Sequence, residues 1–138
     1  MIPKYRAWVK TKKRMVETDD LLDIDYENEV VTTQRVYFYF ENGLPDGRDL
    51  DNFVFEEIKL MQSTDMVDRD GKIIFEGDIV KMAKDVYSES TYYEVVRHRG
   101  GAYRLESKQH GCELWLRHTD CDVVGNIYEN PELLEDKE

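Results

Sequence analysis

The sequence predicts a mainly β protein with short helices, and three observations support this prediction. Short runs of β-branched and aromatic residues recur along the chain. Gly-containing turn pairs separate several of these runs. The 138 residues include 41% hydrophobic side chains, enough to fill a core. We expect a small SH3-like or partly open β-barrel over residues 63–138, preceded by a β-rich portion over residues 1–62. The two portions form separate units or one continuous domain.

The N-terminal portion contains the strongest strand signal. Residues 5–10 and 21–26 alternate weakly between apolar and polar side chains, as half-buried strands do. Residues 30–40 are rich in β-branched and aromatic side chains and predict a longer strand. Because a strand exposes alternate side chains, its terminal aromatic residues cannot all face one core. We therefore expect a homo-oligomer whose interface includes Tyr37, Phe38, Tyr39 and Phe40.

The C-terminal portion begins with two turn signals. Asp70-Gly71 stands between short extended runs, and an Asp-Gly pair suits the positive φ angles of a type I′ hairpin turn. Gly77-Asp78 is a second bend, which opens the apolar strand predicted over residues 79–82. Gly-Asp before an apolar strand is common in small SH3-like barrels.

Further strands and a short helix complete the barrel. Residues 92–97 and 102–106 flank Gly100-Gly101 and predict a hairpin with a two-residue turn. Residues 113–116 and 122–127 supply two more strands. At the end, Asn130 suits a helix cap and Pro131 suits the first helical position.

Charge and composition exclude several classes of protein. The chain carries 30 Asp and Glu against 19 Lys and Arg, so its net charge is −11, and residues 17–57 alone contribute this amount. Such an acidic field opposes nucleic-acid binding at a distance. No apolar run approaches the roughly 18 residues of a membrane helix, and the N-terminus lacks the apolar stretch of a secretory signal. The two cysteines do not make a disulfide framework. We expect a cytoplasmic protein with reduced thiols and no membrane association.

Three longer motifs together resemble a known family. They are the segment at residues 3–8, the segment at residues 61–80 and the segment at residues 124–134. In their order along the chain and in their residues, these motifs are similar to those of the YopX family of phage and prophage proteins. This chain has Thr64-Asp65-Met66 where the family usually has Thr-Gly-Leu. Asp tolerates the left-handed conformation better than most residues, though less well than Gly.

The resemblance implies an origin in a phage or prophage, a setting in the cytoplasm of a bacterial host and a tendency to self-associate. It implies a partner among phage or host proteins, but no known activity, no cofactor and no catalytic residues. Its motif residues are those expected to specify the fold, namely Asp70, Gly71, Gly77, Asp78, Gly125, Asn126, Asn130 and Pro131.

One group of residues has the composition of a zinc site. Zinc ligands are commonly Cys and His, and four such residues lie within twelve positions of the chain. The spacing does not match common zinc modules, and these residues lie outside the family motifs. We therefore predict no metal and keep as the alternative a site made by His110, Cys112, His118 and Cys121.

The hairpin around Gly100-Gly101 is the candidate for nucleic-acid or partner binding. With a two-residue turn, Arg97 lies opposite Arg104, and like charges in such a pair are unfavourable. Glu106 on a diagonal position, a phosphate, or the acidic segment of a neighbouring subunit would each compensate. Arg97, Arg99 and Arg104, with Tyr93 as an aromatic platform, also resemble a surface that binds single-stranded nucleic acid.

No phosphate-binding loop, nucleophile elbow or metalloprotease motif occurs in the sequence. We therefore predict a non-catalytic binding or self-assembly module. The alternative is a nucleic-acid-binding accessory protein of phage DNA metabolism or regulation.

Overall fold

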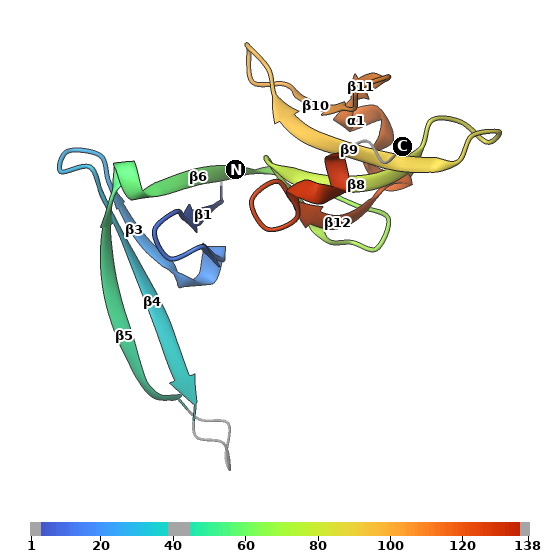
Figure 1. The fold of residues 1–138 in the computed structure, drawn as a ribbon. Coiled ribbons are helices and arrows are strands. Elements are labelled where there is room, and N and C mark those ends of the chain that lie inside the picture. Colours follow the sequence, from blue (N-terminus) through green and yellow to red (C-terminus); the bar gives the residue numbers. More distant parts are fainter. Residues whose placement is uncertain (1–3, 39–44, 136–138) are drawn as a thin grey trace. The chain divides into compact units, whose positions relative to one another are not determined.

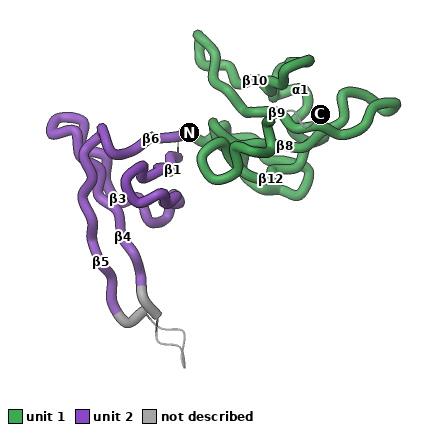
Figure 2. Tube along the Cα trace, in the orientation of Figure 1, with its two compact units in different colours: residues 1, 62–138 green, residues 2–61 purple. Residues whose placement is uncertain are grey.

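The computed structural model describes residues 4–38 and 45–135, and within this range it leaves out the side chains of residues 37, 38, 45 and 46. The chain is mainly β, with one short α-helix and several 3₁₀ turns in the described part, which confirms the predicted class. It folds as two compact units, coloured separately in Figure 2. The N-terminal unit is residues 2–61, and the C-terminal unit is residues 62–138 with residue 1.

The N-terminal unit is built from two antiparallel groups of strands. β1 pairs with β2 and neighbours β6, while β3, β4 and β5 form a three-stranded sheet with β4 in the middle. Alternate residues of these strands fill a small core, in which Val31 and Phe53 lie opposite each other on β4 and β5. The elements are β1 (Tyr5–Val9), β2 (Arg14–Val16), β3 (Leu21–Asp25), β4 (Val30–Phe38), β5 (Pro45–Val54) and the first residues of β6 (Ile58–Val67).

The hairpin of β4 and β5 is longer than the strand beside it. β3 pairs only with residues 30–33 of β4, whereas β4 pairs with β5 as far as Phe38. Residues 34–38 of β4 and residues 45–50 of β5 therefore form a two-stranded ribbon, which we call the arm (Figure 1). An isolated two-stranded ribbon is only marginally stable in water. The predicted aromatic interface lies only partly within the described residues. Tyr37 and Phe38 belong to β4, while Tyr39 and Phe40 lie outside the described residues.

The C-terminal unit is a curled half-barrel with strand order β11-β10-β9-β8-β12. Its inner face is apolar, and Tyr93, Val95 and Leu105 are completely buried there. No helix in the described part of the chain is long and apolar enough to cross a bilayer. The remaining elements are β7 (Ile73–Phe75), β8 (Asp78–Ala83), β9 (Ser90–Arg97), β10 (Tyr103–Glu106), β11 (Gly111–Glu113), α1 (Leu114–Arg117), β12 (Asp122–Asn126) and the 3₁₀ turn η4 (Pro131–Leu134).

A bulge interrupts β6 where the sequence departs from the family pattern. The register of β6 against β7 shifts between Ser63 and Val67, and Asp65 takes a left-handed φ of 62°. Side chains form this bulge. Ser63 Oγ accepts from the Asp65 N–H at 3.1 Å, and Thr64 Oγ1 donates to the Ile74 carbonyl at 2.7 Å. The motif around Thr64 thus sets a backbone shape in which residue 65 needs positive φ.

Replacing Asp65 with Gly should stabilise the protein. A residue with a Cβ carries about 1 kcal/mol or more of strain in the left-handed region, and Gly carries none. We expect Asp65→Gly to raise the Tm by about 3 °C in thermal unfolding followed by circular dichroism. Asp65→Ala, which keeps the Cβ, should give no such gain. A lower Tm for the Gly variant would show that the bulge does not strain Asp65.

Candidate functional site

The β9–β10 hairpin differs from its prediction by one residue. Tyr103 pairs with Arg97, and Arg104 pairs with Val96, so the predicted pairing of Arg97 with Arg104 is wrong. The chain turns through three residues instead of two: His98 N–H donates to the Ala102 carbonyl, and both glycines between them have positive φ. Because successive side chains of a strand point to opposite faces, the extra residue puts Arg97 and Arg104 on opposite faces of the sheet.

Arg104 is neutralised within the sheet. Its Nε lies 2.9 Å from Glu106 Oε1, and its Nη1 contacts Glu113. Glu106 also lies 3.3 Å from His98 Nε2. The hydrogen bond and charge of Arg104 hold the pKa of Glu106 below its ordinary value. Glu106 therefore balances Arg104 rather than Arg97.

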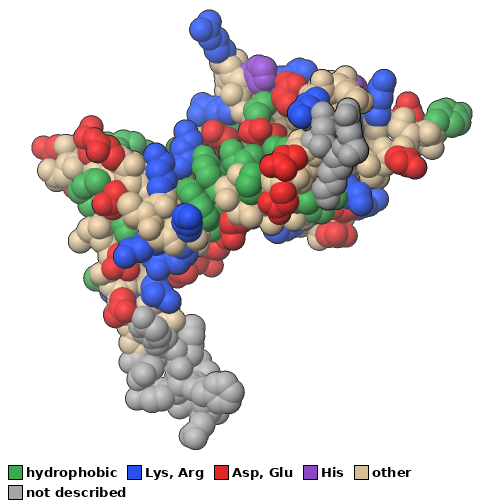
Figure 3. Space-filling view, in the orientation of Figure 1, with side chains coloured by type: hydrophobic (Ala, Val, Ile, Leu, Met, Phe, Trp, Pro, Cys, Tyr) green, Lys and Arg blue, Asp and Glu red, His purple; other side chains and the backbone are tan. Residues whose placement is uncertain are grey.

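The remaining residues of the predicted basic face do not converge either. Arg97 is exposed and donates to Gln62 Oε1 at 3.5 Å, while Arg99 is exposed in the turn. Tyr93 is completely buried in the core, so it offers no ring for stacking with a base. Figure 3 shows acidic and basic side chains interspersed over the face in view. The structure therefore does not assemble the basic aromatic surface that the sequence suggested.

The turn at Asp70-Gly71 is organised by a residue that the sequence pattern did not single out. Only Gly71 of the pair has positive φ, so the predicted type I′ turn is wrong. Asp68 is buried, and its Oδ1 accepts from the backbone N–H groups of Asp70 and Lys72, both at 2.9 Å. Its Oδ2 accepts from the Val123 N–H at 2.9 Å, on β12. One carboxylate thus fixes the turn and joins it to a strand 55 residues further along.

Burial raises the pKa of Asp68, but these backbone donors outweigh burial and hold the pKa below the ordinary 3.8. Asp68 is therefore ionised at neutral pH. Asp carboxylates in turns often accept backbone N–H groups, so the Asp-x-Asp-Gly pattern is the signal that could have identified it.

The second bend and the closing segment are held by similar contacts. Asp78 is buried, and its Oδ2 accepts from the Phe75 N–H at 2.8 Å. Gly77 has a φ of 86°; its N–H donates to the Val95 carbonyl and its carbonyl accepts from Ile127. These bonds link the start of β8 both to β9 and to the chain after β12.

Asn130 does not cap a helix. Its Oδ1 accepts from the Asn126 N–H at 3.2 Å, and a 3₁₀ turn without a side-chain cap begins at Pro131. A Cβ on Gly125 would lie 2.4 Å from Asn130 Oδ1, so only Gly leaves room for this contact. Asn126 Oδ1 in turn accepts from the N–H groups of Tyr128 and Glu129. The motif residues of this segment contact one another and shape the turn after β12.

The four possible zinc ligands are engaged separately. His118 Nδ1 lies 2.7 Å from the Val67 carbonyl, and Cys121 Sγ donates to the His118 carbonyl. His110 packs edge-on against the ring of Tyr93. Over the residues that the structure describes, no group of three or more His, Cys, Asp or Glu is placed to hold a metal ion.

The two thiols of this group are protonated at neutral pH. Burial raises the pKa of Cys112, and it raises the pKa of Cys121 to about 12.

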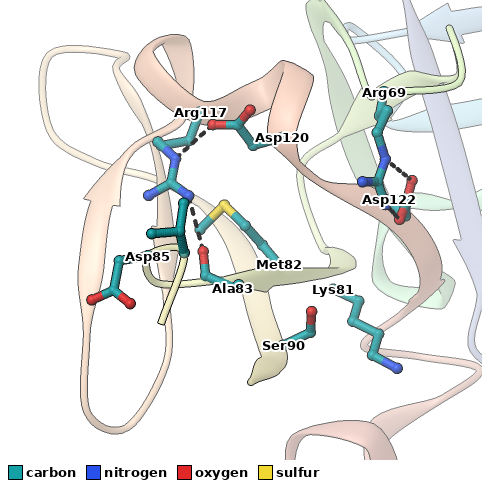
Figure 4. Close-up of a pocket in the computed structure, with 10 residues that line it drawn as sticks. Arg69, Lys81, Met82, Ala83, Asp85, Ser90, Arg117, Asp120 and Asp122 are labelled. Atoms are coloured by element: carbon teal, nitrogen blue, oxygen red, sulfur yellow. Dashed lines mark hydrogen bonds and ion pairs between the residues drawn. The ribbon is translucent and has the colours of Figure 1, made fainter. Parts of the chain in front are cut away.

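A pocket of about 520 Å³ lies on the C-terminal unit between β8, α1 and β12 (Figure 4). Its arginines hold the fold together. Arg117 donates to Asp120 and to the Ala83 carbonyl, both at 2.9 Å, and Arg69 pairs with Asp122. The lining comprises three basic and three acidic side chains. With balanced charge and its guanidinium groups already engaged, this pocket presents no preformed site for an anion.

The fold and these contacts define a two-unit β protein in which motif residues of the C-terminal unit shape turns. The sequence model of the family described as YopX protein matches residues 4–135. The chain therefore belongs to the YopX family, which confirms the resemblance read from its motifs. This is a phage and prophage family for which no activity is established.

Individual relatives agree with this assignment. The SPbeta prophage-derived uncharacterized protein YopX of Bacillus subtilis strain 168 is 30% identical over 71 residues, which are 47% of this chain and 52% of that protein. The sequence match thus spans about half the length of that relative. The crystal structure of protein EF1440 from Enterococcus faecalis is similar with a TM-score of 0.63 at 29% identity, covering 98% of this chain and 99% of that one. The crystal structure of yopX from Bacillus subtilis has a TM-score of 0.65 at 26% identity, with coverages of 96% and 98%.

Asp68→Ala should destabilise the protein by about 2–4 kcal/mol, because it leaves three backbone N–H groups without their acceptor. Urea unfolding at neutral pH measures this difference. Asp70→Ala is the matched control in the same turn, since the Asp70 side chain is exposed, and should change stability by at most about 0.5 kcal/mol. Equal effects of the two substitutions would contradict the role of Asp68.

The effect of Asp68 should also depend on pH. Its pKa is lower in the folded protein than in the unfolded chain, so its contribution is present above pH 3.8 and is lost as the pH falls through the folded value. The difference in unfolding free energy between the parent and Asp68→Ala should therefore shrink below about pH 4.

Proposed function

We propose that this protein is a non-catalytic self-assembly module of a phage or prophage, acting in the cytoplasm of the bacterial host. Two copies associate through one face of the β4–β5 hairpin. The observation that carries this proposal is that one face of that hairpin exposes apolar side chains and bears acids at one end and a base at the other.

The register separates the two faces of the hairpin. On the inner face Val31 and Phe53 belong to the core of the N-terminal unit. The other face, which we call the outer face, carries the alternate pairs Val30–Val54, Thr32–Asn52, Gln34–Leu50 and Val36–Arg48. Leu50 is 54% exposed and Val54 is 48% exposed. They lie on either side of the exposed Asn52, so this face leaves apolar side chains open at two levels of the hairpin.

Charge divides the outer face into two ends. At the first end, β3 places Asp23 opposite Thr32 and Asp25 opposite Val30. Hydrogen bonds from the side chain and the backbone N–H of Asn28 hold the pKa of Asp25 below its ordinary value, so it is ionised. At the other end stands Arg48, which donates to Gln34 Oε1 at 3.1 Å. Leu50 lies between these ends, while Val30 and Val54 lie beside Asp25.

A surface with acids at one end and a base at the other is complementary to itself. In a two-fold dimer, each patch meets the same patch of the partner in reversed orientation. The Arg48 end of one copy then faces the Asp23 and Asp25 end of the other, and the Leu50 side chains of the two copies lie between them. This arrangement lets two chains of net charge −11 approach without placing acid against acid. It also covers the marginally stable arm.

A charge exchange between two variants tests this interface. Arg48→Asp places acids at both ends of the outer face, and the double variant Asp23→Arg with Asp25→Arg places bases at both ends. We expect each variant alone to be monomeric and their equimolar mixture to form heterodimers, because only the mixture restores opposite charges. Native mass spectrometry distinguishes the three samples if one chain carries an isotope label.

Two further variants test whether dimerisation depends on this face in particular. Leu50→Asp should also give a monomer with an unchanged circular dichroism spectrum, since Leu50 is largely exposed. Val86→Asp, at a side chain that is 90% exposed on the C-terminal unit, should leave the dimer intact. Dimers of unchanged stability in both charge variants would place the interface elsewhere.

A further inference from the structure

β9 has one open edge over part of its length. On one side it pairs with β8 from Glu94, which lies opposite Ile79, to Ser90, which lies opposite Ala83. On the other side it pairs with β10 only as far as Glu94, which lies opposite Glu106. After Glu106 the chain leaves the sheet through a turn over residues 107–110. Residues 90–93 of β9 therefore have a described neighbouring strand on the β8 side alone.

Backbone groups of β9 point toward this open edge. The Val95 carbonyl accepts from Gly77 on the β8 side, and the His98 N–H donates to Ala102 on the β10 side. Because the backbone groups of successive residues in a strand alternate in direction, those of Tyr92 and Ser90 share the direction of His98. Their N–H and carbonyl groups thus face the place where β10 would continue. Such an edge is a template for an added strand.

A groove of about 850 Å³ adjoins this edge, and residues 91–94 of β9 line it. β9 forms one wall, the turn over residues 107–110 forms another, and the apolar side chains Leu133 and Leu134 of η4 line it as well. The Tyr92 ring also lines the groove and is in cation–π contact with Lys81 Nζ, 5.9 Å from the ring centroid. The dimensions and the mixed apolar and polar lining suit a short extended segment of polypeptide.

The groove has an acidic character beside the open edge. Four of its lining residues are glutamates and two are lysines. Glu94 and Glu106 are directly opposite each other on β9 and β10, and Arg104 and His98 already balance Glu106. Glu94 makes no ion pair with a described residue. Burial raises its pKa above the ordinary value, as expected for a carboxylate that lacks a compensating charge.

We propose that this groove binds an extended, basic peptide segment of a partner protein, which adds as a strand at the open edge of β9 and places a Lys or Arg side chain beside Glu94. Main-chain hydrogen bonds to Tyr92 and Ser90 hold the segment in register, and the charge of Glu94 selects its side chain. This site lies in the C-terminal unit and does not depend on the dimer interface of the β4–β5 hairpin.

A synthetic peptide with blocked ends and the sequence Val-Lys-Val-Lys-Val-Lys is the probe. We expect it to bind the full chain, measured by fluorescence anisotropy, and to shift the amide resonances of Ser90 and Tyr92 in an isotope-labelled sample. The same peptide with an N-methyl group on every residue keeps its charge but has no main-chain N–H donor on either edge, so it should not bind. The peptide Val-Glu-Val-Glu-Val-Glu should not bind either.

Substitutions separate this groove from general electrostatic attraction. Glu94→Gln keeps the shape of the side chain, removes its charge and should weaken binding of the Lys peptide by about threefold to tenfold. Glu132→Gln is the matched control, because Glu132 is exposed on η4 and does not line the groove. Leu50→Asp should bind the peptide as the parent does, which distinguishes this site from the dimer interface. Equal binding of the N-methylated peptide, equal loss in both Glu variants, or unshifted amides of Ser90 and Tyr92 would each overturn the proposal.

Discussion

The closure of the C-terminal unit depends on the carboxylate of Asp68. It accepts two backbone N–H groups from its own turn and one from β12, and the neighbouring Arg69 adds a backbone bond to the Cys121 carbonyl and an ion pair with Asp122. These contacts bind the turn after β6 to the last strand of the half-barrel. The glycine and asparagine contacts after β12 then bring the chain back toward the start of β8. Residues of the motifs at 61–80 and 124–134 are thus joined in one network of turns.

Much of the fold was predictable because its signals are local. Alternating and β-branched runs identified many of the strands, including the long β4, and Gly77-Asp78 marked the start of β8. The strand predicted over residues 113–116 is wrong, because β11 ends at Glu113 and the next residues form α1. The registers in which the strands pair were harder to predict from the sequence, because they depend on how many residues each turn contains. Gly100-Gly101 fits a two-residue turn by composition, yet Arg99 joins it in a three-residue turn, and this single residue moves Arg104 to the other face. The position of Asn130 suits a helix cap, but its side-chain oxygen accepts a hydrogen bond from the Asn126 N–H instead. This contact exists only in the folded turn.

The candidate surfaces were only partly visible in the sequence. The aromatic run in the sequence indicated the β4–β5 hairpin. The composition of its outer face could not be predicted, because it depends on cross-strand pairs such as Gln34 with Leu50, which are known only once the register is known. The open edge of β9 has no sequence signal, because it arises where β10 ends before its partner does. The two proposed sites follow one principle. A sheet that leaves an apolar face or a row of backbone groups uncovered in the single chain offers a place for a second chain.

Assembly through the outer face is the central claim, and the mass of the unmodified chain in solution tests it most directly. Native mass spectrometry in a volatile low-salt buffer, with a short single-stranded oligonucleotide present in one sample, resolves all the relevant species. We predict a discrete species of twice the 16.4 kDa chain mass in both samples. A chain that stays at 16.4 kDa over the accessible concentrations, or a stoichiometric complex with the oligonucleotide in place of the dimer, would contradict assembly through this face.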